Sequence, residues 1–174
     1  VYKRQVFGLS DATGAFHGGC MVPPQLATEL LAGGKDQRNT QAELLAVLAA
    51  LLTWPEVFRN ADVILYDDSK ATEGNLRKGS AQDGDSQALV ACIWLTLAAL
   101  QVDLWHVWIP SDANPGDPFS RPLDVKKQQQ ANMLTARYGS EGSTLVLPPS
   151  IRTTPAQWLE AMQLSQRDAV TGRG

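Results

Sequence analysis

Asp62-Val-Ile-Leu-Tyr-Asp-Asp68-Ser69 is the stretch around which the rest of the chain can be organised. It is a short apolar run that ends abruptly on two carboxylates and a hydroxyl. A buried strand ordinarily continues apolar or ends in a Gly or Pro turn. Here the strand delivers acid groups to its carboxyl end, where open α/β sheets bind their ligands. The stretch predicts an α/β fold with Asp68 in a metal-binding carboxylate cluster.

A second strand near the N-terminus has the same kind of ending. Val6–Leu9 is apolar and leads into Ser10-Asp11-Ala12-Thr13-Gly14. A further apolar piece, bracketed by glycines, reaches Val22 and is expected to pair with the first strand as a hairpin. Asp11 is then a second carboxylate at a strand end, although a plain turn explains the same residues equally well.

A long helix is predicted between the two strands. A short helix over Pro24–Leu31 precedes it, since proline is well placed as the first residue of a helix. Thr40-Gln-Ala-Glu43 then has the form of a capping box that opens the long helix. Glu43 is either a cap residue or a further ligand, and the pattern alone favours the cap. The expected inner stripe is Ala42, Leu45, Ala46, Ala49, Leu52 and Thr53.

Two more helices and a strand follow Asp68. Ser69 is the expected N-cap of the first helix, and Asp67 and Asp68 also precede it, so interaction with the helix dipole is the plain alternative for both acids. Asp117 lies in a turn-rich loop after the strand, where Pro118 restricts it to an extended or first-turn conformation. The expected elements are helices over Lys70–Leu76, Gln87–Leu100 and Asp124–Tyr138, and strands over Val102–Ile109 and Leu145–Leu147.

Length and composition predict one globular domain with an extension. Of the 174 residues, 44% are hydrophobic and 19% charged, which is ordinary for a packed domain. We assign residues 1–138 to the domain and 139–174 to a C-terminal extension or linker with one amphipathic helix. No apolar run reaches the roughly 18 residues that span a bilayer, so no membrane association is expected. Cys20 and Cys92 are expected to be reduced core thiols of an intracellular protein, cytoplasmic or nuclear.

Charge is distributed unevenly along the chain. Residues 1–120 carry 8 basic and 14 acidic side chains, and 121–174 carry 7 and 4. An acidic body with a mildly basic tail suits a protein that concentrates carboxylates around cations, with phosphate contacts confined to local patches.

Asp11, Glu43, Asp68 and Asp117 together suggest more than each does alone. Three of them lie at or beyond expected strand ends, and the fourth lies on a helix between two of those strands. Mg²⁺ and Mn²⁺ take oxygen ligands, and a pair of such ions can activate water and stabilise the leaving oxygen of a phosphodiester. Since clustered carboxylates repel one another without a cation, the four acids predict a two-ion site.

The order of these motifs resembles that of the ribonuclease H superfamily, whose acids follow the order Asp, Glu, Asp, Asp. Thr40-Gln-Ala-Glu-Leu-Leu-Ala-Val is similar to its Glu-bearing helix, and Leu-Tyr-Asp-Asp-Ser69 to its third-acid strand. Leu76-Arg-Lys-Gly79 matches the Lys-Gly stretch that follows. Val107-Trp-Ile-Pro-Ser-Asp-Ala-Asn-Pro-Gly-Asp-Pro-Phe-Ser-Arg121 is similar to the retroelement form of the last motif, closest to DIRS-like tyrosine-recombinase retrotransposons. The resemblance covers about residues 4–137; the last loop lacks the histidine of the cellular enzymes.

The resemblance implies a mixed sheet of about five strands flanked by helices. It also implies an endonuclease that uses two Mg²⁺ or Mn²⁺ ions, held by the four acids, to hydrolyse the RNA strand of RNA–DNA hybrids. The parent would be a retrotransposon polyprotein that includes a reverse transcriptase domain. Expected contacts to the hybrid come from Ser10, Thr13, Asn39, Thr40 and Gln41, and expected contacts to its phosphates from Arg77, Lys78, Lys126 and Lys127.

Two other functions fit the same pattern. One is a non-catalytic ribonuclease H-like module that binds nucleic acid or serves as a scaffold. The other is a transposase or integrase of the same fold, which would act on DNA and depends on three acids.

Overall fold

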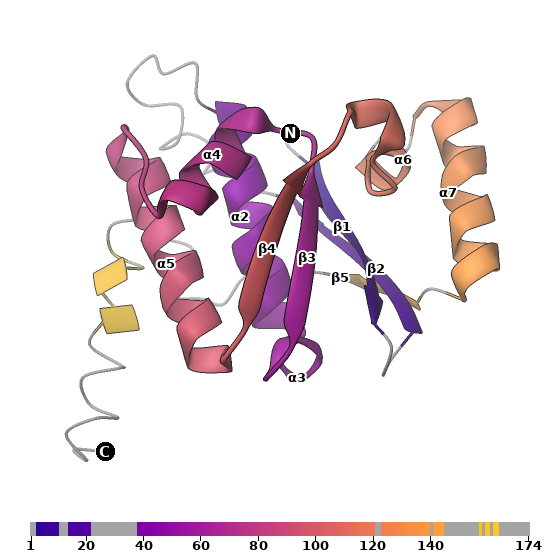
Figure 1. Cartoon of the computed structure of the whole chain (residues 1–174). Helices are drawn as coiled ribbons and strands as arrows, with labels where there is room; N and C mark the ends of the chain where they lie inside the picture. The colour runs from indigo at the N-terminus through magenta and orange to yellow at the C-terminus, as the bar shows by residue number, and fades with distance from the viewer. Residues whose placement is uncertain are drawn as a thin grey trace.

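The computed structural model describes residues 3–10, 14–21, 38–120, 123–139 and 141–144, with 157, 159, 160, 162 and 163 near the C-terminus. Helices surround two small sheets (Figure 1), which confirms the α/β class. The predicted helix over Pro24–Leu31 and the predicted strand over Leu145–Leu147 lie outside the described residues.

Five strands form two separate ladders. β1 (Lys3–Ser10) pairs antiparallel with β2 (Gly14–Met21), which confirms the predicted hairpin, and β5 (Glu141–Thr144) pairs parallel with β2. β3 (Asp62–Asp67) pairs parallel with β4 (Asp103–Trp108). Within the described residues no ladder joins the two sheets, so the single five-stranded sheet stays an expectation.

Residue types that favour helix ends explain where several helices begin and where α4 ends. α4, α5 and α7 begin where the side chains of Ser69, Asp83 and Asp124, respectively, accept hydrogen bonds from first-turn N–H groups, and α4 ends at Gly79 with a φ of 67°. The bounds are α2 Arg38–Thr53, α3 Pro55–Phe58, α4 Lys70–Lys78, α5 Gly84–Leu100, the 3₁₀ turn η1 Ser111–Ala113, α6 Asp117–Ser120 and α7 Val125–Tyr138.

The predicted capping box at Thr40 is wrong. α2 begins at Arg38, so Thr40 lies inside its first turn, where it is buried. Glu43 therefore does not occupy the N3 position of a capping box, and its carboxylate accepts from the Thr72 hydroxyl instead. The two residues before Thr40, Arg38 and Asn39, are polar, so the burial that holds α2 in place begins at Thr40 and Gln41.

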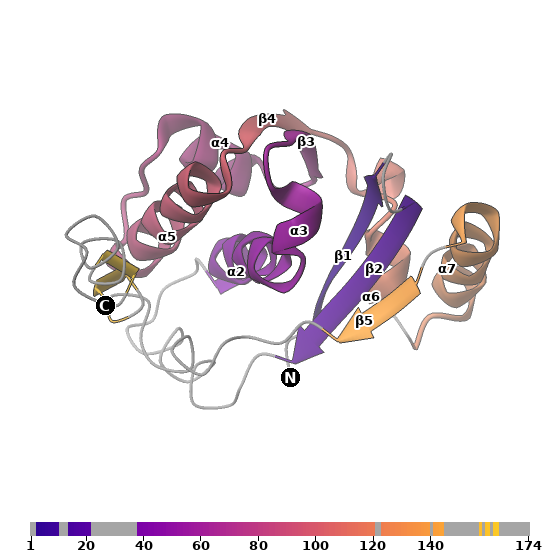
Figure 2. The same cartoon turned by 90° about the horizontal axis from the view of Figure 1, so that it is seen from below.

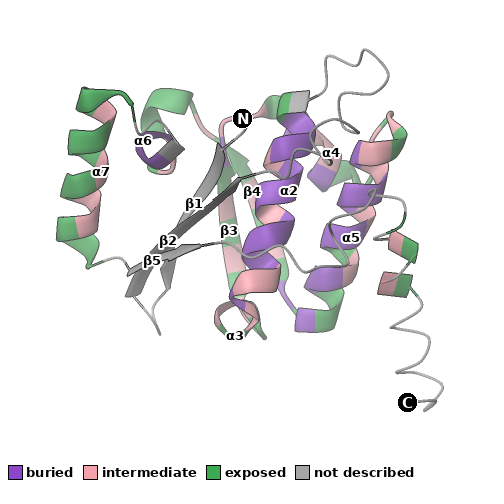
Figure 3. Cartoon of the chain, turned by 180° about the vertical axis from the view of Figure 1, so that it is seen from behind, coloured by how far each residue is buried: buried purple, intermediate pink, exposed green. Residues whose placement is uncertain are grey.

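α2 is the centre of the core. It packs against α5, contacts α4 and β1 on other sides, and is buried along most of its length (Figures 2 and 3). Three fully buried leucines, Leu44, Leu45 and Leu48, meet Ile93 and Leu97 of α5 in one hydrophobic cluster. This agrees with a helix that is apolar on most of its circumference, as expected from the sequence.

Parts of the C-terminal extension contact the domain. β5 lies beyond residue 138 and adds to the sheet of β1 and β2. Leu159 and Met162 pack against the hydrophobic cluster. None of the helices in the described part of the chain is both long and apolar enough to cross a membrane.

Cys92 provides a test of the packing of α5. It is free and fully buried, and burial raises the pKa of its thiol from 9.0 to about 11. As the pH rises, the Cys92 thiol ionises in the unfolded chain before it ionises in the folded one. Burial of the neutral thiol therefore contributes fully to the free energy of unfolding below pH 9, and this contribution is lost between pH 9 and about 11. In a Cys20→Ser variant we expect no reaction with a thiol reagent below pH 9 until urea unfolds the chain. Rapid reaction of the native protein would contradict the packing of α5.

Candidate functional site

Asp68 and Asp117 reach the same edge of the β3–β4 sheet. The two strands are parallel and in register, so their carboxyl ends coincide. Asp68 directly follows β3, and the loop after β4 leads through η1 to Asp117, the first residue of α6. This is the geometry expected for ligands at the carboxyl edge of an α/β sheet.

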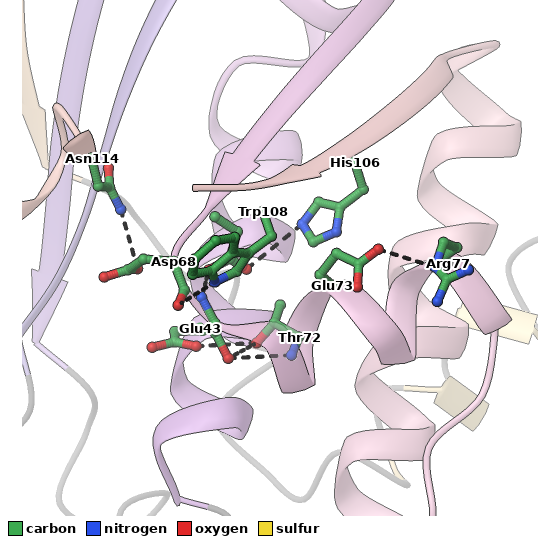
Figure 4. A network of polar contacts seen from close by, with 10 residues as sticks. Glu43, Asp68, Thr72, Glu73, Arg77, His106, Trp108 and Asn114 are labelled. Atoms are coloured by element: carbon green, nitrogen blue, oxygen red, sulfur yellow. Dashed lines mark hydrogen bonds and ion pairs between the residues drawn. The ribbon is translucent and has the colours of Figure 1, made fainter. Parts of the chain in front are cut away.

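Asn114 connects these two acids. Its side-chain amide donates to Asp68 Oδ1 at 3.2 Å, and its own Oδ1 accepts from the Gly116 N–H at 2.9 Å (Figure 4). Its carbonyl accepts from the Asp117 N–H at 3.1 Å. One residue therefore orients the Asp68 carboxylate and shapes the turn that carries Asp117.

Glu43 reaches the same region from α2. The Thr72 hydroxyl donates to Glu43 Oε2 at 3.1 Å and lies 3.0 Å from the Ser69 hydroxyl (Figure 4). Thr72 is fully buried, so this link is held within the packed interior. Glu43 is thereby connected through two hydroxyls to the residue next to Asp68.

Asp117 is buried and already has a cationic partner. Lys127 Nζ of α7 lies 2.9 Å from Asp117 Oδ2. The ammonium offsets the charge of a carboxylate that burial would otherwise disfavour. Lys127, predicted as a phosphate contact, is engaged with this carboxylate.

The structure distinguishes the two neighbouring aspartates. Asp67 is buried, and its Oδ1 accepts from the Ser69 N–H at 2.8 Å. Its Oδ2 lies 3.7 Å from Nε2 of His106, whose ring nitrogens have no hydrogen-bond partner among the described residues. Asp68 is half-buried and turns toward Asn114. Asp67 therefore serves the fold, and Asp68 is the carboxylate presented at the edge.

The predicted four-acid cluster is described only in part. Asp11 and Thr13 lie outside the described residues. In the described ranges no three His, Cys, Asp or Glu side chains are gathered closely enough to hold a metal ion. β1 ends at the opposite end of the molecule from the carboxyl ends of β3 and β4 (Figure 1), so its last residue, Ser10, is not brought to Asp68.

The donor set nonetheless has the chemistry that Mg²⁺ requires. Glu43, Asp68 and Asp117 offer carboxylate oxygens, and these are the hard ligands that Mg²⁺ and Mn²⁺ take in proteins. Hydrogen bonds from neutral or cationic groups hold all three in place. The ligand type of these residues therefore suits a divalent cation.

Two predicted nucleic-acid contacts are corrected by the structure. Thr40 and Gln41 are buried, and the Gln41 amide donates to Asp83 Oδ1 at 3.0 Å inside the protein. Both lie in the first turn of α2, on sides of the helix that are packed against other elements. Asn39, by contrast, is exposed.

Arg77 and Lys78 are exposed at the far end of α4. Arg77 forms an ion pair with Glu73 at 3.0 Å. Because α4 starts beside Asp68 and rises about 1.5 Å per residue, these two side chains begin roughly 12 Å from the acidic edge. Arg77 and Lys78 are therefore placed to contact a phosphate of a nucleic acid that is distant from the acidic edge.

The sequence did not indicate which residues hold the acids in place. The Trp108 indole N–H donates to the Asp68 carbonyl at 3.1 Å, and Lys70 Nζ lies 4.7 Å from the centroid of the Trp108 ring. This places a cation beside the acidic edge. Asn114 was within the quoted loop motif, but nothing in the sequence indicated the roles of Thr72, Trp108 or Lys70.

Comparisons with protein-family models, with curated proteins and with solved structures found no match to this chain. Its function is therefore inferred from the resemblance of its motifs and from the chemistry of the site.

Proposed function

We propose that the chain is a ribonuclease H-like, metal-dependent endonuclease that hydrolyses the RNA strand of RNA–DNA hybrids. Its parent would be a retrotransposon polyprotein with a reverse transcriptase domain. The observation that carries the proposal is the Asn114 side chain, which joins the Asp68 carboxylate to the turn of Asp117. A loop with only a structural role has no need for a side chain that both binds a half-buried carboxylate and shapes the turn of a second acid.

Glu43, Asp68 and Asp117 would hold the ions, and Asp11 would be a fourth ligand on the evidence of the sequence. Bound Mg²⁺ or Mn²⁺ would supply an activated water and charge stabilisation at the leaving oxygen. The protein's own part is positional. Asn114 orients Asp68, the Thr72 hydroxyl orients Glu43, and each acid is thereby held for its task.

Cationic and polar groups near the acids would meet the substrate. Lys70, held over Trp108, is placed to contact a phosphate near the scissile bond. Asn39 lies four residues before Glu43 on α2, hence on the same side of the helix. It is the best remaining candidate to contact a 2′-hydroxyl, the group by which a protein tells RNA from DNA.

A panel of substrates tests the proposal. The full chain is incubated with an RNA–DNA hybrid, duplex DNA and single-stranded RNA of one sequence, in Mg²⁺, in Mn²⁺ and with a chelator. We expect cleavage of the RNA strand of the hybrid only, abolished by the chelator. Cleavage or strand transfer on duplex DNA would instead favour a transposase or integrase.

A non-catalytic module is the second candidate. The Asp117–Lys127 ion pair favours it, because the lysine occupies a carboxylate that a metal would need. Calorimetric titration with Mn²⁺ separates the two functions. Hybrid binding with neither cleavage nor Mn²⁺ binding would establish the module and exclude the nuclease.

A further inference from the structure

The outer face of the β3–β4 sheet is an exposed apolar surface. Ile64 and Tyr66 alternate on β3 with residues that pack inward, and Trp105 and Val107 do the same on β4. The register sets Ile64 beside Trp105 and Tyr66 beside Val107, so the four side chains form one patch. Trp105 is 71% and Tyr66 53% exposed. Soluble chains rarely leave such a patch uncovered unless it binds something.

Two carboxylates border this patch. Asp62 and Asp103 stand directly opposite each other at the start of the strands, and both are exposed. Across the described residues neither side chain has an ion pair or side-chain hydrogen bond. Both also line a pocket with Ile64 and Trp105, at the opposite end of the strands from Asp68. Like charges placed opposite one another destabilise a ladder, so a cationic partner is the natural complement.

The chain itself carries a matching surface on α7. No residue of α7 is buried, and Val125 and Met133 are 68% and 64% exposed. With 3.6 residues per turn, Val125, Met133, Lys126 and Arg137 fall within roughly 120° of the helix circumference. Lys127, which holds Asp117, points to the other side. This side of α7 is thus mainly apolar, with Gln129 between Val125 and Met133, and it has a basic border.

The two surfaces do not meet within one chain. β3 and β4 have no described element over their outer face, and α7 stands beyond β2 and β5 (Figure 2). Each surface is apolar, and the acidic border of one complements the basic border of the other. Nucleic acid is a poorer partner for the sheet, because Asp62 and Asp103 would repel phosphates.

We propose that the outer face of β3–β4 binds α7 of a second copy of this chain. Reciprocal exchange of the two contacts around a two-fold axis gives a closed dimer. Trp105 is the central anchor on the sheet, Met133 is the anchor on the helix, and Lys126 and Arg137 approach the two aspartates. The inference does not depend on the proposed nuclease activity.

Mass measurement by light scattering and sedimentation over a concentration series tests the dimer. We expect wild type to approach twice the chain mass of 18.8 kDa. Trp105→Gln and Met133→Glu should each weaken dimerisation by about 30-fold or more, as for loss of a central anchor. Gln128→Glu adds the same charge to a different side of α7 and should leave the dimer intact.

Mixing the two damaging variants makes the test specific. The intact helix of Trp105→Gln can bind the intact sheet of Met133→Glu, so the mixture should associate although neither variant does alone. A wild type that stays monomeric at all concentrations overturns the proposal. So does a Met133→Glu variant that still dimerises, since the sheet faces would then pair directly. If the wild type is monomeric and Trp105→Gln loses hybrid binding, the face would be assigned to nucleic acid instead.

Discussion

Replacing Asp68 with Asn is expected to lower the rate of hybrid cleavage by about a thousandfold or more. The change keeps the size of the side chain and the acceptor that Asn114 uses, but it removes the charge that a divalent cation needs. Loss of a ligand removes several kcal/mol of transition-state stabilisation. Single-turnover cleavage in Mg²⁺ and Mn²⁺ measures the loss, and circular dichroism checks that the fold is kept.

Asp67→Asn is the matched control for this variant. It places the same substitution one residue earlier, where the side-chain oxygen can still accept from the Ser69 N–H. We expect cleavage within about tenfold of wild type, since this residue supports the strand end and not the reaction. Equal Mg²⁺-dependent cleavage by wild type and Asp68→Asn would exclude Asp68 as a ligand. If only Asp67→Asn lost activity, Asp67 would be the ligand and Asp68 the structural residue.

Asn114→Ala is expected to lower kcat by roughly 10- to 100-fold, the usual cost of removing a residue that orients a metal ligand. The Asp68 carboxylate loses its amide donor, and the turn before Asp117 loses the bond to the Gly116 N–H. Because Asn114 holds ligands and does not hold substrate, KM for the hybrid should change by no more than about twofold. The Mg²⁺ concentration at half-maximal rate should rise.

Asp112→Ala serves as the control in the same loop, since Asp112 is exposed on η1. It should leave kcat and the Mg²⁺ dependence unchanged. Asn114→Asp keeps the acceptor for Gly116 but adds a second negative charge beside Asp68, so we expect it to be at least as damaging as alanine. An Asn114→Ala variant with an altered KM and an unaltered Mg²⁺ dependence would show that Asn114 contacts substrate instead.

Local signals predicted most of the elements after residue 38. Ser69, Gly79 and Asp124 act at helix ends where their residue types favour it. In the predicted stripe of α2, Ala42, Leu45, Ala46 and Ala49 are buried, and Leu52 and Thr53 are half-buried. The strands at Asp62 and Asp103 alternate between an inward and an outward face. These features depend on neighbours in the chain, which is why they can be inferred from spacing.

The capping box predicted at Thr40 is wrong because the start of α2 does not depend on chain neighbours alone. α2 starts two residues before this local signal, and its tertiary packing against α5 and β1 buries Thr40 and Gln41 in the first turn. Packing free energy along a whole apolar face exceeds the value of one cap, which is about 1 kcal/mol.

From Asp62 to Ser69, the order of residue types is enough to predict a strand that ends on two carboxylates and a helix that starts at Ser69. It could not decide which carboxylate serves the fold, because both precede the same helix. The tertiary structure decided this by placing His106 of β4 next to Asp67 and Asn114 of the following loop next to Asp68. Both partners lie about 40 residues or more away along the chain, and contacts at that separation arise only when β4 aligns beside β3. The same alignment left Trp105 and Tyr66 exposed together, a surface that the alternation in either strand alone does not reveal.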